Sequence, residues 1–385
     1  MSQTDLLAAA TQLSQVCYAA ADEIEQQRRL PAELSAQLAA AGFYRMGIPE
    51  AVGGLETPPP ISSEVIEILA RGDASSAWVT FIGMTSGTNL AMIPSASARA
   101  IFTQPEVMLT GVFAPSGRAD KVDGGFRVSG QWQWGSGSQN ADWVMGGCMF
   151  FDDGEPLLDA RGNQRTHMVI MPASDIEFLD TWHVSGLSGS GSLDFRVDDV
   201  FVPEDRVAGF KLEREVLARP LYSFPQFTFL ALGIGAVCLG IARAAIDELI
   251  AVAVAKKRVG SSATIASRST AQAKLAEAEA DLRSARSFYY HELNQAWEIA
   301  QSGEKVSLEG RRDMRLATTN AVLKSAAVID EMYNLGGGTS VYRQSRLQRY
   351  FRDVHVATQH IMVAPQTLET LGAMYFGNEV KTAMI

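Results

Sequence analysis

Two tryptophans and a group of serine hydroxyls lie within one short segment, residues 124–143 (GGFRVSGQWQWGSGSQNADW). Apolar and polar residues alternate along its first half, a pattern typical of a β-strand, and this alternation places Trp132 and Trp134 on one face. A tryptophan can stack on an aromatic ring, while Ser136 and Ser138 can offer hydroxyl groups to its heteroatoms. The segment therefore suits a planar ring held at a sheet edge. The alternative is an ordinary β-turn whose tryptophans pack in a core.

A second segment, residues 180–207, favours the ring-binding interpretation. Together the two segments resemble the middle domain of the acyl-CoA dehydrogenase superfamily. In that domain a G-x-x-x-W-[IS]-[ST] turn cradles flavin, and a G-L-x-x-x-x-S-x-x-x-x-F-x-x-V-x-V-P run forms a later strand. The matching residues here are Gly130, Trp134, Ser136, Gly186, Leu187, Ser192, Val200, Val202 and Pro203.

Three further matches extend the resemblance along nearly the whole chain, in order. The segment GVFAPSG, residues 111–117, stands where the family has its first flavin-contacting strand and loop. Three glycines, residues 336–338, and the pair Arg352-Asp353 fit the family's closing helices.

Composition is consistent with a large protein that folds around a hydrophobic core. The chain has 385 residues, 47% of them hydrophobic, which favours two or three subdomains. A net charge of −10 argues against general affinity for nucleic acid or anionic membranes. The densest positive cluster, residues 256–258, is either a phosphate contact or a solvated helix end. Three widely spaced cysteines suggest neither a disulfide framework nor a metal site.

No segment predicts export or membrane insertion. The N-terminus lacks a basic region followed by an apolar core, and the most hydrophobic run, Phe229 to Ala242, is too short to cross a bilayer before Arg243 interrupts it. We expect a cytoplasmic protein.

The elements that position these residues form three successive zones. Residues 1–105 are rich in alanine and leucine and predict an N-terminal α-helical domain. Residues 106–212 contain short β-branched and aromatic runs separated by turns and predict a central β domain. Residues 213–385 return to long amphipathic patterns and predict a C-terminal four-helix bundle. Its four helices are expected at Ile234–Lys257, Thr270–Gln301, Leu308–Leu335 and Tyr350–Met374. The fold class is therefore α+β, with the helical, β-barrel-like and bundle domains of the acyl-CoA dehydrogenase family.

A pair of glycines, Gly233 and Gly235, is not expected to bind a dinucleotide. The third glycine of the usual fingerprint is replaced by Cys238, and no βαβ unit surrounds the pair. Close helix packing is the preferred interpretation.

The chemistry depends on whether a carboxylate base is present. Dehydrogenases of this family remove a proton next to a thioester with a glutamate. The two positions that carry it in the family correspond here to Ile361 and to Phe229–Leu230, and no acidic residue occurs between Glu215 and Asp247. Both positions are apolar, so the resemblance to the dehydrogenases does not extend to their base.

A histidine lies close to one of these positions instead. His360 stands where the flavin-dependent monooxygenases of this fold, the oxygenase components of two-component aromatic hydroxylases, carry a histidine near the flavin. A neutral imidazole there could accept a phenolic proton or hydrogen-bond the oxygenated flavin. His355 and His183 are expected to be structural. Some members carry another histidine in the helix after a Ser-Ala-Trp segment, which this chain lacks after Trp78, leaving room for an aromatic such as an indole.

The resemblance implies a flavin-dependent monooxygenase that hydroxylates or epoxidises an aromatic, phenol-like or indole-like substrate through a C4a-hydroperoxyflavin. Its reduced flavin, FAD or FMN, would come from a separate reductase that consumes NADH, and O2 would be the co-substrate. The expected catalytic residues are His360 and Ser136. The expected cofactor contacts are Phe113, Ala114 and Ser116 at the pyrimidine edge, Trp134 on the ring, Ser136 near N5, and Arg258, Gly336 and Gly337. The expected walls of the substrate pocket are Phe227, Leu230 and Ile361.

Two alternatives remain open at this point. The first is an acyl-CoA dehydrogenase or oxidase with a displaced base, and the second is a catalytically inactive scaffold.

The family's adenine-binding sequence is altered here, since serines replace a phenylalanine and a glycine at residues 261 and 262. The resemblance also implies a homotetramer with the bundles at its centre, and no metal.

Overall fold

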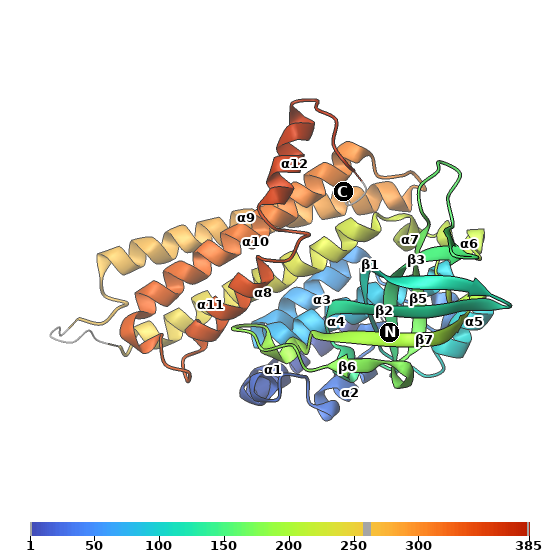
Figure 1. The fold of residues 1–385 in the computed structure, drawn as a ribbon. Helices are drawn as coiled ribbons and strands as arrows, with labels where there is room; N and C mark the ends of the chain where they lie inside the picture. The colour runs from blue at the N-terminus through green and yellow to red at the C-terminus, as the bar shows by residue number, and fades with distance from the viewer. Residues whose placement is uncertain (1, 257–262, 383–384) are drawn as a thin grey trace.

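The computed structural model describes residues 2–256, 263–382 and 385. Helices at both ends of the chain flank one β-sheet, and Figure 1 shows α3 and α4 between the long helices and the strands. The N-terminal helices are α1 (Gln3–Gln27), α2 (Ala32–Ala40), α3 (Pro59–Gly72), α4 (Ala74–Gly87) and α5 (Ser95–Ile101).

Helix α4 is buried along its whole length, which explains why apolar residues occur on all its faces. It begins at Asp73, whose carboxylate accepts hydrogen bonds from the backbone N–H and the hydroxyl of Ser76 at 2.7 and 2.8 Å. The backbone N–H groups of a helix's first turn have no carbonyl partner within the helix, and the Asp73 carboxylate supplies an acceptor for one of them. The helix packs against both α8 and β1, so it joins the long helices to the sheet.

The sheet has seven strands, and it curls back on itself. Its order is β4-β3-β1-β2-β7-β6, with β5 paired to β3, and β1 runs parallel to β3. An isolated bridge between Val169 and Val207 connects β5 to the segment that follows β7, which gives the sheet its barrel-like form. The strands are β1 (Leu109–Val122), β2 (Gly125–Gly135), β3 (Trp143–Asp152), β4 (Glu155–Pro156), β5 (Thr166–Pro172), β6 (Glu177–Leu179) and β7 (Leu193–Pro203).

The expectation that Trp132 and Trp134 share one face of a strand is wrong. The Trp132 side chain is fully buried, whereas Trp134 is 67% exposed. Trp134 has a left-handed backbone, φ 67°, and the pairing of β2 with β7 shifts register between Trp132 and Gly135. Because the alternation of faces holds only in regular extended backbone, this bulge turns the second tryptophan outward.

The Trp132 ring is the centre of the sheet's core. It stacks on Phe195 with ring centroids 5.1 Å apart, and its Nε1–H donates to the Gly147 carbonyl at 2.8 Å. Glycines make room for the ring: a Cβ added at Gly117 would lie 2.3 Å from it, and one at Gly146 would lie 2.6 Å away. The aromatic core therefore excludes this tryptophan from any ligand site.

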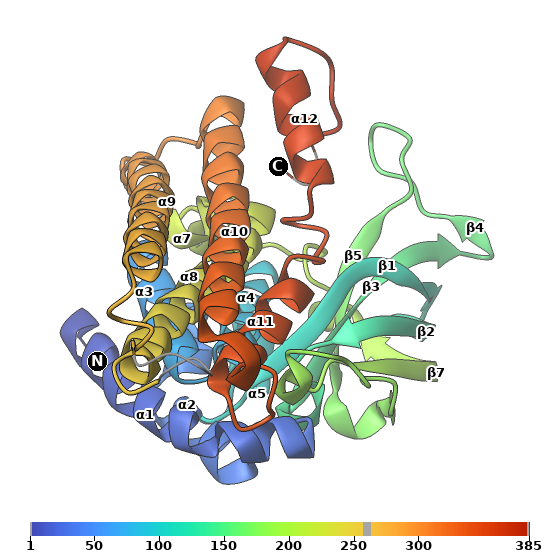
Figure 2. The same ribbon diagram turned by 90° about the vertical axis from the view of Figure 1, so that its left-hand side faces the viewer.

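The C-terminal part contains the four expected helices, but the fourth ends earlier than the sequence predicts. The expected fourth helix, Tyr350–Met374, is two helices, and the connection 358–365 separates them. Pro365 precedes the second helix, and a proline there cannot continue the backbone hydrogen bonding of the first. Figures 1 and 2 show α12 projecting beyond the bundle. The helices are α6 (Arg214–Leu217), α7 (Pro220–Ser223), α8 (Gln226–Ala253), α9 (Ser269–Gln301), α10 (Leu308–Gly336), α11 (Arg346–Ala357) and α12 (Gln366–Tyr375).

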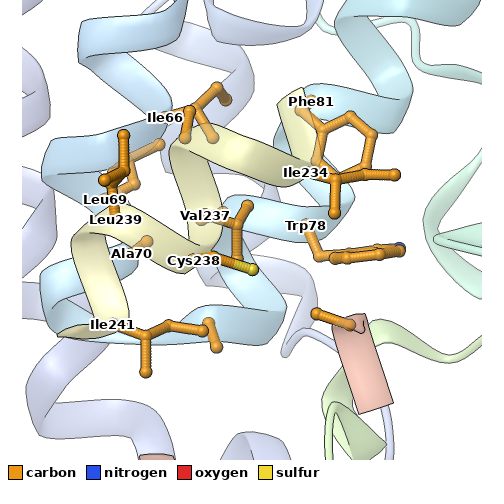
Figure 3. Close-up of a cluster of buried hydrophobic side chains, with 14 of the residues drawn as sticks. Ile66, Leu69, Ala70, Trp78, Phe81, Ile234, Val237, Cys238, Leu239 and Ile241 are labelled. Carbon is orange, nitrogen blue, oxygen red and sulfur yellow. The ribbon is translucent and has the colours of Figure 1, made fainter. Parts of the chain in front are cut away.

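Helix α8 is the central core helix of the protein. Within the described part of the chain it alone is long and apolar enough to cross a membrane, but 94% of its apolar window is buried inside the protein. Figure 3 shows its side chains, Ile234 and Val237 among them, packed against α3 and α4. An added Cβ at Gly233 would lie 2.5 Å from Phe81, and one at Gly235 would lie 2.9 Å from Tyr289. The two glycines thus serve close helix packing, as the sequence predicts.

Candidate functional site

Trp78 connects three parts of the chain that are far apart in sequence. It lies on α4, almost completely buried, and its Nε1–H donates to Ser136 Oγ at 3.0 Å. The edge of its ring faces His360 in the α11–α12 connection, with ring centroids 5.9 Å apart. The sheet, the N-terminal helices and the C-terminal helices therefore meet at one point, and this point includes both of the predicted catalytic residues.

A chain of buried serine hydroxyls extends from Ser136. Ser136 Oγ lies 2.7 Å from Ser192 Oγ, which lies 2.7 Å from Ser190 Oγ. The backbone supports the same contact, because the Gly137 N–H donates to the Ser190 carbonyl at 2.7 Å. The segments 124–143 and 180–207, joined in the sequence analysis only by resemblance, are thus in direct contact.

One arrangement of the serine hydroxyl protons leaves the Ser136 proton available to a ligand. A hydroxyl has one donor and two acceptor positions, and Trp78 uses one acceptor position of Ser136. If Ser190 donates to Ser192 and Ser192 to Ser136, both acceptor positions of Ser136 are filled. The remaining donor of Ser136 could then bind a nitrogen or oxygen atom of a ring.

Replacing Ser136 with alanine is expected to destabilise the fold by about 1–3 kcal/mol, because the buried Trp78 N–H loses its acceptor. Chemical unfolding of Ser136→Ala, Trp78→Phe and the double variant forms a mutant cycle. The double variant should lose less stability than the sum of the two single losses, since the pair is already broken in each. Additive losses would contradict a direct bond between these side chains.

His360 is held as a neutral imidazole. Its Nδ1 accepts the Met362 backbone N–H at 3.2 Å, so the ring proton resides on Nε2. Burial, together with the nearby positive charge of Arg315, lowers the pKa of His360 to about 4. At neutral pH the residue therefore presents an N–H donor and carries no charge.

The predicted ring contacts lie where β1 and β2 stop pairing. The register between these strands covers Arg118–Val122 of β1, and the pairing of β1 with β3 shifts between Val112 and Gly117. Ala114 and Ser116, inside this irregular stretch, are exposed. Phe113 packs edge-on against Phe227 at the start of α8, with ring centroids 5.6 Å apart, and so extends the site toward the bundle.

Two predicted walls of the substrate pocket differ in exposure. Ile361, which follows His360 in the chain, is 69% exposed, whereas Leu230 is buried in the main core that also contains Trp78. Gly336 and Gly337 end α10, where the Lys256 ammonium bonds the Gly336 carbonyl. Arg258, with residues 257–262, lies outside the described residues.

The two histidines expected to be structural, His355 and His183, contact acidic side chains near the protein surface. His355 Nε2 lies 2.8 Å from Asp330 Oδ1, and His183 lies beside Arg28 and Asp180. Neither contacts the Trp78 cluster through any hydrogen bond of the described chain.

Carboxylates are not part of the cluster. Among the described residues, the hydrogen bonds of Trp78, Ser136 and His360 involve no acidic side chain. One acidic side chain does contact the backbone of a predicted ring contact: Asp194 Oδ1 accepts a hydrogen bond from the Trp134 N–H at 3.2 Å. This bond supports the left-handed turn, so Asp194 acts on the backbone.

Sequence reasoning missed Trp78 and Ser190, together with the role of the Gly186-Leu187 turn. Gly186 approaches α11 so closely that an added Cβ would lie 2.3 Å from the Arg352 carbonyl oxygen. The Leu187 N–H donates to Asp353 Oδ1 at 2.6 Å. The G-L and Arg-Asp motifs are therefore two halves of one contact that fixes α11 beside the site.

The Asp353 contact should make stability depend on pH. Burial raises the pKa of the Asp353 carboxyl to about 7. Because this is above the unfolded value, its stabilising contribution is complete below about pH 4 and is lost as pH rises through about 7. Asp353→Asn keeps an oxygen acceptor but cannot ionise. Its free energy of unfolding, relative to wild type, should rise by roughly 2–3 kcal/mol between pH 5 and pH 8.

Denaturant titrations at both pH values test this expectation. Asp198→Asn, a change at an exposed aspartate, serves as the control and should show no such gain. A parallel pH response in both variants would contradict the assignment.

The chain is similar to known proteins along most of its length. The chain matches the family models for the acyl-CoA dehydrogenase N-terminal domain over residues 2–100 and C-terminal domain over residues 232–365. It is 34% identical to indole-3-acetate monooxygenase of Pseudomonas putida, over 93% of this chain and 90% of that protein. It is 28% identical to the flavin-dependent monooxygenase oxygenase subunit HsaA of Rhodococcus jostii, over 95% and 96%. The crystal structure of XiaF from Streptomyces sp., in complex with FADH2 and glycerol, superimposes with a TM-score of 0.89 at 26% identity, covering 98% and 96%.

Proposed function

We propose, from the premise that this chain belongs to the flavin-dependent monooxygenases of the acyl-CoA dehydrogenase fold, that it oxygenates an aromatic compound of indole-like structure. The observation that carries the proposal is the cluster of Trp78, Ser136 and neutral His360, whose hydrogen bonds within the described residues involve no carboxylate. A dehydrogenase would need an ionised base at this point. The similarity to an enzyme named for indole-3-acetate supports the substrate class.

The residues present fit a flavin ring. Trp134 offers an exposed aromatic surface beside the strand, and the irregular stretch Phe113–Ser116 offers backbone groups outside the regular pairing of the sheet. The Ser136 hydroxyl adds a buried polar group that accepts from Trp78 and has a proton to donate in the arrangement described above. Reduced flavin, when bound, supplies two electrons to O2, so that one oxygen atom enters the substrate and the other leaves as water.

His360 acts in this proposal as a hydrogen-bond donor through Nε2. Its Nδ1 is already occupied by the Met362 N–H, and a group with a pKa of about 4 is a poor acceptor for a phenolic proton. This favours an indole-like substrate, whose oxygenation does not begin with loss of a phenolic proton, over a phenol. Phe113 and Phe227, which pack edge-on against each other, add an apolar wall to the proposed site.

A complete cofactor site is proposed to need a second copy of the chain. Phe227 lies in the first turn of α8 and Gly336 lies beyond the other end of this helix, and a helix of 28 residues is about 42 Å long. If Gly336 and Gly337 contact the flavin, they must do so in a neighbouring copy. We therefore retain a homotetramer, with either FAD or FMN, as part of the proposal.

A separate NADH-consuming reductase is the proposed electron donor; the name oxygenase subunit of a relative supports a separate partner component. The cytoplasm is the expected location, which fits three buried cysteines without disulfides in the described chain.

The test supplies purified protein with chemically reduced flavin, labelled ¹⁸O2 and a series of indoles and phenols. The proposal expects one labelled oxygen atom in an indole product. Reduction of bound oxidised flavin by an acyl-CoA, with no oxygenated product from any aromatic, would instead establish the dehydrogenase alternative.

A further inference from the structure

Arg315 is a buried arginine with unpaired hydrogen-bond donors. It lies in the first half of α10 with 3% of its surface exposed, and its Nε and Nη1 have no partner among the described residues. Burial alone lowers the pKa of its guanidinium to about 10, with no carboxylate contributing. Arg349, a comparably buried arginine, is paired with Asp22 and Glu25. An unpaired buried cation is strongly unfavourable, so Arg315 implies an anionic partner.

The position of Arg315 connects it to the proposed active site. Its charge helps to lower the pKa of His360, so the two side chains lie within electrostatic reach of each other. An added Cβ at Gly235 would lie 3.0 Å from Thr318, which places this part of α10 beside the first half of α8, the helix that carries Phe227 in its first turn. Thr319, one turn after Arg315 on the same face, also has a buried hydroxyl without a partner.

We propose that Arg315, assisted by Thr319, binds the carboxylate of an aromatic acid substrate, an inference that rests on the proposed function and narrows its substrate class. The carboxylate would supply the missing acceptors for the guanidinium N–H groups. The aromatic part would then extend toward His360 and Trp78. A neutral aromatic of the same shape would leave the arginine unpaired.

The first measurement needs no variant. Equilibrium binding of indole-3-acetate and indole-3-acetamide to the wild-type protein with reduced flavin, under anaerobic conditions, compares a carboxylate with its neutral amide. Hydrogen bonds to a charged group favour the acid by roughly 10- to 150-fold. Equal affinities for the two compounds would overturn the proposal, whether or not any variant folds.

The variants assign the preference to one residue. Arg315→Met should abolish the preference for the acid over the amide by weakening acid binding alone, and Arg315→Lys should keep part of this preference. Arg312→Met, the same type of change at an arginine paired with Asp313 on the same helix, should leave it unchanged. If Arg315→Met weakens the acid and the amide equally, or weakens flavin binding instead, the carboxylate site does not exist.

Failure of this inference and failure of the proposed function have different signatures. If the protein prefers the acid through Arg315 but forms no oxygenated product, the carboxylate site is supported and the proposed monooxygenase activity is contradicted. If the acid and the amide are oxygenated equally, the activity is supported and the carboxylate site is contradicted.

Discussion

Replacing His360 with leucine is expected to lower the rate of product formation by about 10²- to 10³-fold, the usual cost of removing one positioned donor from an active site. The imidazole presents Nε2–H because the Met362 N–H holds Nδ1. Leucine removes that donor at similar volume. Oxygen consumption should continue and release hydrogen peroxide, because His360 is proposed to direct the oxygen atom and not to supply electrons.

His360→Asn gives the informative comparison. Its amide can still donate a hydrogen bond, so it should recover part of the lost coupling between oxygen consumption and product. His355→Leu, at a residue paired with Asp330 outside the cluster, should couple as the wild type does. Simultaneous assays of product and peroxide measure the effect, and a wild-type yield from His360→Leu would refute the role.

The pH profile tests the neutral state of the same residue. With its pKa lowered to about 4, His360 should cause no inflection in product yield between pH 5 and pH 9. The same shift affects the free energy of unfolding. Because the pKa of His360 in the folded protein is below its ordinary value near 6.5, the neutral imidazole contributes its full stability above that pH. This contribution is lost as the pH falls through about 4. An inflection near 6.5 that disappears in His360→Asn would contradict this.

Replacing Trp132 with alanine is expected to destabilise the protein by about 3–5 kcal/mol. The ring is completely buried, stacks on Phe195 and donates to the Gly147 carbonyl, and its removal leaves a cavity that rigid strands cannot close. Trp134→Ala, two residues later, removes the same side chain from an exposed position and should change stability by less than about 1 kcal/mol.

Denaturant unfolding of both variants gives the difference directly. Trp134→Ala should show its effect in flavin affinity instead. Similar stability losses in the two variants would mean that the tryptophans have equivalent environments, contrary to the structure.

The order of helices and sheet could be predicted because it depends on patterns within single elements. The long amphipathic runs predict α9 and α10 to within a residue at each end. The contrast between Trp132 and Trp134 could not be predicted, since it depends on one left-handed residue and a register shift that alternation cannot reveal. The broken fourth helix was missed because the apolar pattern continues through the break.

The predicted site was incomplete because its remaining residues are recognisable only by their neighbours. Trp78 occurs in a helix that is buried throughout, so its composition gives no sign of the bond to Ser136. Arg315 lies among other arginines in the segment LEGRRDMR, and only its burial without a partner distinguishes it. The resemblance located His360 and Ser136, but the packing of α4 between the sheet and the bundle shows how they meet.

The connection between α11 and α12 contains both buried and exposed positions. Val354 and Ala357 anchor the first helix in the core, and Met362 and Val363 of the connection are buried in the same core. His360 therefore lies between two fixed points, while Gln359 and Ile361 are exposed. Mutations at the two exposed positions can therefore change the surroundings of His360 while the architecture of the bundle persists. Divergence toward new aromatic compounds during evolution would concentrate at these positions, where a new side chain disturbs folding least.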